Sequence, residues 1–217
     1  MTKHIRSEAY PVVLHIPHVS TVVPPGVREA FVLSDADLEA ELLRMTDRYT
    51  DVLFDLSDCA ASIVTFPGSR LVVDPERFTD DAQEPMAARG MGAVYTHTSN
   101  GRPLRRRLSN EERASLIREY YEPHHQRLTD AVEGVLGRWG WCLVLDCHSF
   151  PSAPLPYELD QSPLRPDICI GTDDYHTPAW LTDVAVAAFS DRGFTVYVNR
   201  PFSGALVPTV YYRKVSQ

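Results

Sequence analysis

The stretch Val-Val-Leu-His-Ile-Pro-His at residues 12–18 places a short apolar run directly before a polar loop. Apolar runs of this length are typical of buried β-strands. Five further runs share this character, at residues 61–66, 71–74, 142–146, 168–171 and 194–198. Because amphipathic helical patterns lie between several of them, the sequence predicts an α/β fold with a mostly parallel or mixed central sheet and helices on both faces.

Three helices are expected, at residues 34–56, 109–139 and 178–191. The first begins at Ser34, with Asp37 three positions later, and the second at Ser109, with Glu112 three positions later. This spacing indicates a helix N-terminus, because both side chains can accept hydrogen bonds from backbone N–H groups that the helix leaves unpaired. Residues 78–108 are expected to form a long irregular connection, of a kind that is commonly functional or mobile.

Composition bounds the size and the partners of the protein. At 217 residues, 44% of them hydrophobic, the chain can bury one full core, and we expect a single domain over residues 1–217. The 29 acidic and 21 basic side chains give a net charge of -8, which disfavours nucleic acid and anionic membrane surfaces as partners. The basic run at residues 102–107 lacks interleaved aromatic residues and is expected to be a solvated loop or an anion contact.

Cysteine usage and the N-terminus indicate the compartment. The four cysteines show no C-x-x-C spacing, and at least three lie in apolar runs, where thiols behave as small hydrophobes. Residues 1–10 contain charges but no apolar stretch long enough for a signal peptide, and no segment approaches the length of a membrane span. We therefore expect a cytoplasmic protein.

Polar side chains follow most of the predicted strands. His18 comes just after the first run, and polar segments begin other loops at residues 74–77, 146–149 and 199–202. In an open parallel sheet, ligands bind beyond the carboxyl ends of the strands. Histidines, arginines and carboxylates are therefore expected to meet at one edge of the sheet.

His18 and His148 are candidate metal ligands in this set. Either one alone could equally be a core residue, but two at one edge favour a catalytic zinc site, whose usual ligands are imidazoles and a carboxylate. Asp146 lies two residues before His148. It could hydrogen-bond a ligating ring and fix its tautomer, or cap the following loop.

A third ligand is expected on the first helix, because the short His-x-x-Glu spacing is absent. Asp47 projects beside an apolar patch and is preferred to Asp51, which lies closer to the solvated, charged stripe of the helix. For both carboxylates, the alternative is an ion pair on the helix face with Arg44 or Arg48.

Arg70 and Arg77 flank the apolar run at residues 71–74. A planar guanidinium suits bidentate recognition of a carboxylate or stabilisation of a developing oxyanion. Either arginine could be a surface charge. The pair favours an acidic small-molecule substrate, which would need positive charge within an acidic protein.

Together these motifs resemble the N-formylglutamate amidohydrolase family, whose relatives include the zinc carboxypeptidases and aspartoacylase. The resemblance covers nearly the whole chain and implies a three-layer fold of the zinc-carboxypeptidase-like, phosphorylase/hydrolase-like kind. The matching stretches are His-Ile-Pro-His-Val-Ser (15–20), Thr-Asp-Arg-Tyr-Thr-Asp (46–51), Val-Val-Asp-Pro-Glu-Arg-Phe (72–78), Gly-Arg-Pro-Leu (101–104), Tyr-Tyr-Glu-Pro-His-His (120–125), Leu-Asp-Cys-His-Ser-Phe-Pro-Ser (145–152) and Asn-Arg-Pro-Phe-Ser-Gly (199–204).

The resemblance implies zinc-dependent hydrolysis of the formamide bond of N-formyl-L-glutamate to formate and glutamate, as in histidine breakdown. By motif position, His18, Asp47 and His148 would hold one zinc ion. Arg70 and Arg77 would face the carboxylates of the substrate or the oxyanion. The other substrate-binding candidates at matching positions are His125, Asn199 and Arg200.

Three departures from the family pattern bear on substrate and mechanism. Pro-His-Val-Ser replaces Pro-His-Ser-Gly, so the loop after the first ligand differs. Asp-Pro-Glu-Arg replaces Asp-x-Asn-Arg, and Glu76 beside Arg77 would partly neutralise that arginine, which favours a different or less acidic substrate. Family members also continue into a strand that ends in a catalytic glutamate, whereas this sequence ends at Gln217.

The carboxylate base is therefore expected in a C-terminal segment that this sequence omits, or at Glu158, whose simpler interpretation is a surface residue. Two other hypotheses stand beside the formylglutamate one. The first is a zinc deacylase or carboxypeptidase-like enzyme for another N-acyl amino acid. The second is a metal- and ligand-binding protein without turnover. For His125, helix packing is the alternative to a role in the site.

Overall fold

A computed structural model describes residues 9–56 and 58–214 of the chain, which folds into two compact units, Met1–Phe150 and Pro151–Gln217. The prediction of one domain over residues 1–217 stays a prediction. The residues expected to lack a signal peptide, 1–10, lie mostly outside the described part.

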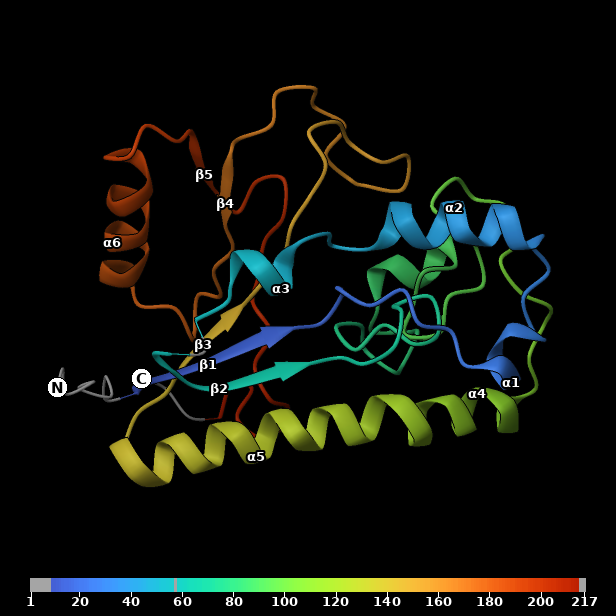
Figure 1. Cartoon of the computed structure of the whole chain (residues 1–217), viewed down its shortest axis with the longest axis horizontal. Coiled ribbons are helices and arrows are strands. Elements are labelled where there is room, and N and C mark those ends of the chain that lie inside the picture. The colour runs from blue at the N-terminus through green and yellow to red at the C-terminus, as the bar shows by residue number, and fades with distance from the viewer. Residues whose placement is uncertain (1–8, 57, 215–217) are drawn as a thin grey trace, which may run out of the picture. The chain divides into compact units, whose positions relative to one another are not determined.

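A three-stranded parallel sheet forms the centre of the first unit (Figure 1). Strand β1 (Tyr10–Ile16) lies between β2 (Ala60–Thr65) and β3 (Leu143–Asp146), and both neighbours run parallel to it. His15 of β1 pairs in register with Asp146, the last residue of β3. The carboxyl ends of β1 and β3 therefore lie side by side, and the predicted α/β class with a parallel sheet is confirmed.

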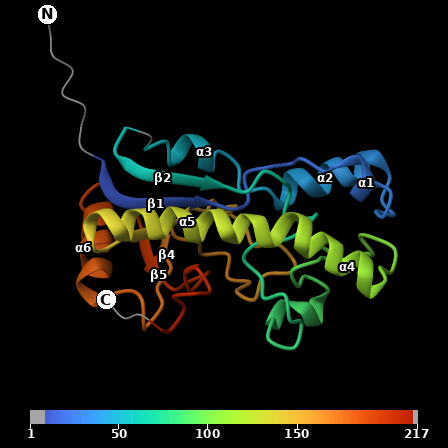
Figure 2. The same ribbon diagram turned by 90° about the horizontal axis from the view of Figure 1, so that it is seen from below.

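Both faces of β1 are covered, which explains its continuous apolar sequence. Leu14 and Ile16 pack with Cys147, and Phe54 lies against this cluster. Because side chains alternate along a strand, His15 points to the opposite face, where its ring meets helix α5 (Glu122–Trp139). Figure 2 shows α5 running along this face of the sheet.

The second predicted helix is confirmed, with an irregularity in its middle. It consists of α4 (Asn110–Leu116), a π-helical turn (Ile117–Tyr121) and α5. The predicted capping box is present, since Ser109 and Glu112 exchange side-chain to backbone hydrogen bonds. π-turns change the register of a helix and recur near functional sites.

The first predicted helix is not continuous, and this prediction is wrong. Helix α2 (Asp35–Met45) ends at Thr46, whose backbone is extended, and α3 (Thr50–Leu53) begins after Tyr49 in a left-handed conformation with φ 67°. The N–H of Asp47 donates to the carbonyl of His18 at 3.0 Å, so a tertiary hydrogen bond replaces the helical one. Asp47 consequently lies in a break between helices.

Residues 71–74 are fully buried but do not form a strand, so this strand prediction is also wrong. The segment is a turn whose carbonyls at Leu71 and Val72 accept hydrogen bonds from Arg105. Burial without sheet pairing produces the same apolar pattern as a buried strand. Arg105 is itself buried against Phe31, contrary to the solvated loop expected for residues 102–107.

Two shorter helices complete the first unit. Helix α1 (Pro25–Arg28) precedes α2, and a 3₁₀ turn (Pro85–Arg89) lies within the connection at residues 78–108. This connection is otherwise irregular, as predicted.

The second unit contains a parallel pair of strands, β4 (Ile168–Ile170) and β5 (Val196–Val198), with helix α6 (Ala179–Ser190) between them in sequence. These elements match three of the predicted segments. All four cysteines fall in the described part and are free thiols. None of the helices in residues 9–56 and 58–214 combines the length and apolar character that crossing a bilayer requires.

Candidate metal centre

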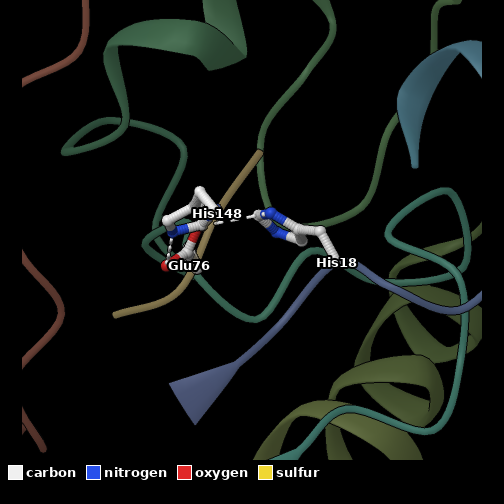
Figure 3. A group of neighbouring side chains, drawn as sticks. All are labelled: His18, Glu76 and His148. Carbon is white, nitrogen blue, oxygen red and sulfur yellow. Dashed lines mark hydrogen bonds and ion pairs between the residues drawn. The ribbon is translucent and has the colours of Figure 1, made fainter. Parts of the chain in front are cut away.

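Two histidines meet at the carboxyl end of the first unit's sheet. His18 follows β1 and His148 follows β3, and their ring centroids are 5.3 Å apart. Figure 3 shows the two rings with the carboxylate of Glu76 beside His148. The parallel register of β1 and β3 brings them together, because both loops leave the same edge.

The ring of His18 is held on one side only. Its Nε2 lies 2.9 Å from Oδ1 of Asp74, and the Asp74 carboxylate is fully buried. Its Nδ1 is buried and has no hydrogen-bond partner among the described residues. That atom faces Oε2 of Glu76 at 3.4 Å and Oδ2 of Asp47 at 3.8 Å. A nitrogen lone pair facing two carboxylates is repulsive unless a cation or a proton lies between them.

His148 is surrounded by carboxylates on both ring nitrogens. Nδ1 lies 2.8 Å from Oδ2 of Asp47. Nε2 lies 3.1 Å from Oε1 of Glu76 and 3.5 Å from Oδ2 of Asp146. Asp47 therefore reaches both imidazoles through the same oxygen, and each ring has its other nitrogen on a different carboxylate.

The electrostatics of the cluster favour positive charge between these groups. Burial lowers the pKa of His148, but Glu76, Asp146 and Asp47 outweigh it and raise the pKa well above its usual value. The pKa of His18 is raised in the same way, against burial and Arg70, by Asp74, Glu76 and Asp47. Burial raises the pKa of Asp47, yet the two histidines bring it below its usual range.

Residues that could hold a metal ion therefore lie together here. Among the described residues, two groups of three have ligand atoms within 4.8 Å of one another: His18, Glu76 and His148 form one, and His15, Glu76 and Asp146 form the other. Imidazole nitrogens with carboxylate oxygens are donors that suit zinc and other divalent ions. The unpartnered Nδ1 of His18 and the excess of carboxylates both fit a bound cation.

The two predicted arginines lie beside Asp74 and differ in how closely other side chains bind their guanidinium groups. Arg70 donates to Oδ2 of Asp74 at 2.7 Å, and Tyr95 donates its hydroxyl to the same oxygen at 2.6 Å. Arg77 has weaker partners, at 3.7 Å from Asp74 and 3.5 Å from Glu84, and its buried Nε has no hydrogen-bond partner within the described residues.

Glu76 does not neutralise Arg77 as expected from the sequence. The described contacts of its side chain are with the imidazoles of His18 and His148, and Glu84 is the carboxylate beside the Nη1 group of Arg77. The sequence missed this because Glu76 and Arg77 are neighbours in the chain, whereas the turn at 74–77 sends their side chains to different partners.

His125 holds the loop that carries Glu76. Its Nε2 donates to the carbonyl of Pro75 at 2.7 Å, and its ring stacks on Tyr121 with centroids 4.1 Å apart. The Tyr121 hydroxyl donates to the carbonyl of Arg77 at 3.1 Å. The π-turn before α5 thus places two side chains on the same loop.

The remaining predicted residues are described by their own contacts within each unit. Asp51 is exposed and accepts from the N–H of Val52, and Arg44 pairs with Glu41 instead of Asp47. In the second unit, the carboxylate of Glu158 is buried, contrary to the surface position expected, and accepts from Arg165 and from the N–H of Leu155 at 2.9 Å. Also in that unit, Asn199 bonds to Thr172, and Arg200 pairs with Asp160 at 2.9 Å.

Three residues of the site were absent from the predicted ligand and substrate sets, namely Asp74, Glu76 and Tyr95. The first two belong to the quoted motif at 72–78, so their position beside a conspicuous arginine was an available signal. Tyr95 lies in the irregular connection and gave none.

Comparison with known proteins identifies the family. The family model described as N-formylglutamate amidohydrolase matches residues 10–217. A protein of Pseudomonas aeruginosa named N-formylglutamate deformylase is 28% identical over 208 residues, which are 93% of this chain and 74% of the relative. One of Pseudomonas putida with the same name is 30% identical over 167 residues, 75% of this chain and 59% of that protein.

Solved structures of similar fold support the same family. The crystal structure of N-formylglutamate amidohydrolase from Ralstonia eutropha superposes with a TM-score of 0.80 at 27% identity, over 92% of this chain and 75% of that one. A protein of Agrobacterium tumefaciens shares the fold, with a TM-score of 0.64 at 20% identity, over 89% of this chain and 70% of that one. The resemblance inferred from the motifs is confirmed, and this chain belongs to the N-formylglutamate amidohydrolase family.

Proposed function

We propose that this chain is a zinc-dependent amidohydrolase that cleaves the formamide bond of N-formyl-L-glutamate or a similar N-acyl amino acid. The observation that carries the proposal is the buried Nδ1 of His18, which faces two carboxylates beside a second imidazole. The names of the two Pseudomonas relatives support the substrate. A place in histidine breakdown follows from that substrate and stays a prediction.

The ligand set we assign is His18, Asp47 and His148, as the sequence predicted. The Asp47 oxygen lies near Nδ1 of both rings, whereas the Nε2 atoms are held by other carboxylates, Asp74 on His18 and Glu76 with Asp146 on His148. Metal-bound histidines usually donate their second ring N–H to a carboxylate in this way. Zinc in such a site supplies Lewis-acid activation of water and of the acyl oxygen.

We assign proton transfer to Glu76. Its two oxygens are divided between His18 and His148 at 3.4 and 3.1 Å, and none of its described bonds is to an arginine. A carboxylate in this position is suited to take a proton from water and to deliver it to the leaving amine. Glu158 stays a prediction for the same role, with its carboxylate already paired with Arg165.

Arg77 is the group we assign to the carboxylates of the substrate, because its Nε has no hydrogen-bond partner in the described part of the chain and its ion pairs are long. Arg70 is fully engaged by Asp74 and Tyr95, so we assign it to holding Asp74. Its predicted contact with the oxyanion, and the substrate contacts of His125, Asn199 and Arg200, stay predictions.

The test is a direct assay of the purified full-length chain loaded with zinc. Release of formate from N-formyl-L-glutamate is expected, together with an equal amount of glutamate. Cleavage of N-acetyl amino acids or peptides in its place would favour a different acyl amino acid, and binding of these compounds without cleavage would favour a non-catalytic role.

Substitution of the two site carboxylates should separate their roles. Asp47→Asn is expected to weaken zinc affinity by at least about tenfold, because an amide oxygen is a poorer ligand than a carboxylate. Glu76→Gln is expected to keep the zinc and to lower kcat by about 10²-fold, the usual contribution of a positioned acid or base. Chelator competition and formate release measure the two effects, and the opposite pattern would exchange the assignments.

Arg77→Met should raise KM for N-formyl-L-glutamate by about tenfold or more and leave zinc affinity unchanged. A hydrogen bond to a charged group contributes about 1.5–3 kcal/mol, and each 1.4 kcal/mol is a factor of ten. Arg118→Met, which removes an exposed partner of Glu111, is the matched control. Unchanged kinetics in the Arg77 variant would remove this residue from the substrate site.

A further inference from the structure

Three side chains, His124, His15 and Asp146, form a hydrogen-bonded chain that ends beside His148. His15 on β1 and His124 on α5 are fully buried, and their Nε2 atoms are 2.8 Å apart. Nδ1 of His15 lies 2.7 Å from Oδ1 of Asp146. The other oxygen of Asp146 is the one that lies 3.5 Å from Nε2 of His148.

The two ends of this chain fix the direction of its hydrogen bonds. At one end, a carboxylate offers only acceptors, and Oδ1 of Asp146 lies 2.7 Å from Nδ1 of His15, so this nitrogen carries the proton of that bond. At the other end, Arg127 can only donate, and its Nη2 lies 3.4 Å from Nδ1 of His124. Burial, with neighbouring positive groups, lowers the pKa of His124 to about 2, so this ring is neutral.

The contacts with Arg127 and with Asp146 agree on the direction of the hydrogen bond between His124 and His15. With Nδ1 of His124 accepting, its proton is on Nε2. His15 accepts this proton at Nε2, as a neutral ring with its own proton on Nδ1 does. The bond therefore runs from His124 to His15, and then from His15 to Asp146.

From this geometry we propose that His15 and His124 are positioning residues, which lock the Asp146 carboxylate beside Nε2 of His148, where it shares the ring N–H with Glu76. The proposal rests on the proposed function in taking His148 as a metal ligand. Residues that hold a ligating imidazole through a carboxylate raise its basicity and fix its tautomer.

The same argument weighs against a second cation on the group of His15, Glu76 and Asp146. In the assigned tautomer, Nδ1 of His15 is protonated and its Nε2 lone pair accepts from His124. His15 then has no free nitrogen with which to bind a metal.

The tautomers can be measured on the unaltered full chain. Long-range proton–nitrogen NMR correlation of nitrogen-15-labelled protein should show His15 protonated at Nδ1 and His124 protonated at Nε2. The reverse tautomer at either ring would overturn the proposal. This experiment requires neither metal nor turnover, so its result is independent of the assay for formate release.

Zinc affinity gives the functional readout. His124→Leu removes the donor at similar volume and is expected to weaken zinc binding about 10–100-fold, the usual effect of losing a group that orients a ligand. His124→Gln keeps an N–H near the Nε2 position and should restore most of the affinity. The measurement is competition with a chromophoric chelator on folded protein.

The matched control is Val132→Ala, on the same buried face of α5 two turns later. It should lower the melting temperature without changing zinc affinity by more than about twofold, since it leaves the chain of hydrogen bonds intact. Equal zinc affinity in the Leu, Gln and unaltered proteins would overturn the proposal, as would two zinc ions per chain that fall to one in His15→Gln. If His124→Leu does not fold, the tautomers of the unaltered chain decide.

Discussion

His148→Ala is expected to abolish stoichiometric zinc binding and to lower the rate of formate release by at least about 10³-fold. His148 contacts Asp47 through Nδ1 and Glu76 through Nε2, so its removal takes away a ligand and leaves the carboxylates facing each other. A catalytic metal contributes several kcal/mol to the transition state, and each 1.36 kcal/mol is a factor of ten in rate. Metal analysis after gel filtration and a formate assay measure the two losses.

A second histidine substitution distinguishes loss of the site from general damage. His97→Ala removes an imidazole of the same unit, whose described side-chain bond is to Thr96 in the irregular connection. It should retain zinc and activity. A zinc content unchanged in the His148 variant would show that the ion binds elsewhere, and the ligand assignment would then fail.

The sheet was predictable from sequence because burial and pairing coincide in it. The runs that became β1, β2 and β3 are apolar, and those of β1 and β3 end at polar loops at the carboxyl edge of the sheet. Residues 71–74 show the limit of this signal, because they are buried but do not pair in a sheet, and the carbonyls of Leu71 and Val72 accept from Arg105 instead. An apolar run indicates that a segment is buried, but it does not indicate which groups the backbone of that segment bonds to.

The predicted helix boundaries were wrong where a tertiary hydrogen bond determines the backbone conformation. Local sequence favours a continuous helix from Ser34, and the break at Thr46 depends on the carbonyl of His18, which is distant in the chain. The polarity of Asp47 beside an apolar patch nevertheless predicts that it is a metal ligand. The structure brings it to the two histidines through the break, not through a helix face.

Within the site, residue types in the sequence indicated which side chains take part, but not which of them contact one another. His18 and His148 could be selected because imidazoles after buried strands are few and chemically specific. The contacts of Glu76 with both rings, and the chain from His124 to Asp146, join residues that are far apart in sequence. No spacing rule on one sequence encodes such contacts.

Asp74 is the residue on which most of the buried charge of the site converges. Its carboxylate accepts from His18, Arg70 and Tyr95, and the N–H of Glu76 donates to it at 3.0 Å. Burial opposes its ionisation, yet Arg70 and His18 bring the pKa of Asp74 well below the usual value. One carboxylate therefore compensates the buried guanidinium and fixes the ring of the first ligand.

Asp74→Ala is accordingly expected to lower the free energy of unfolding by about 3–5 kcal/mol, because removing one partner of a buried ion pair leaves the other charge uncompensated. Urea denaturation measures the loss, and Glu111→Ala, which removes an exposed partner of Arg118, should change little. Zinc affinity should fall as well, since His18 loses the acceptor of its Nε2 proton. A destabilised Asp74 variant with full zinc affinity would show that this carboxylate supports the fold alone, and that His18 is oriented by something other than its partner at 2.9 Å.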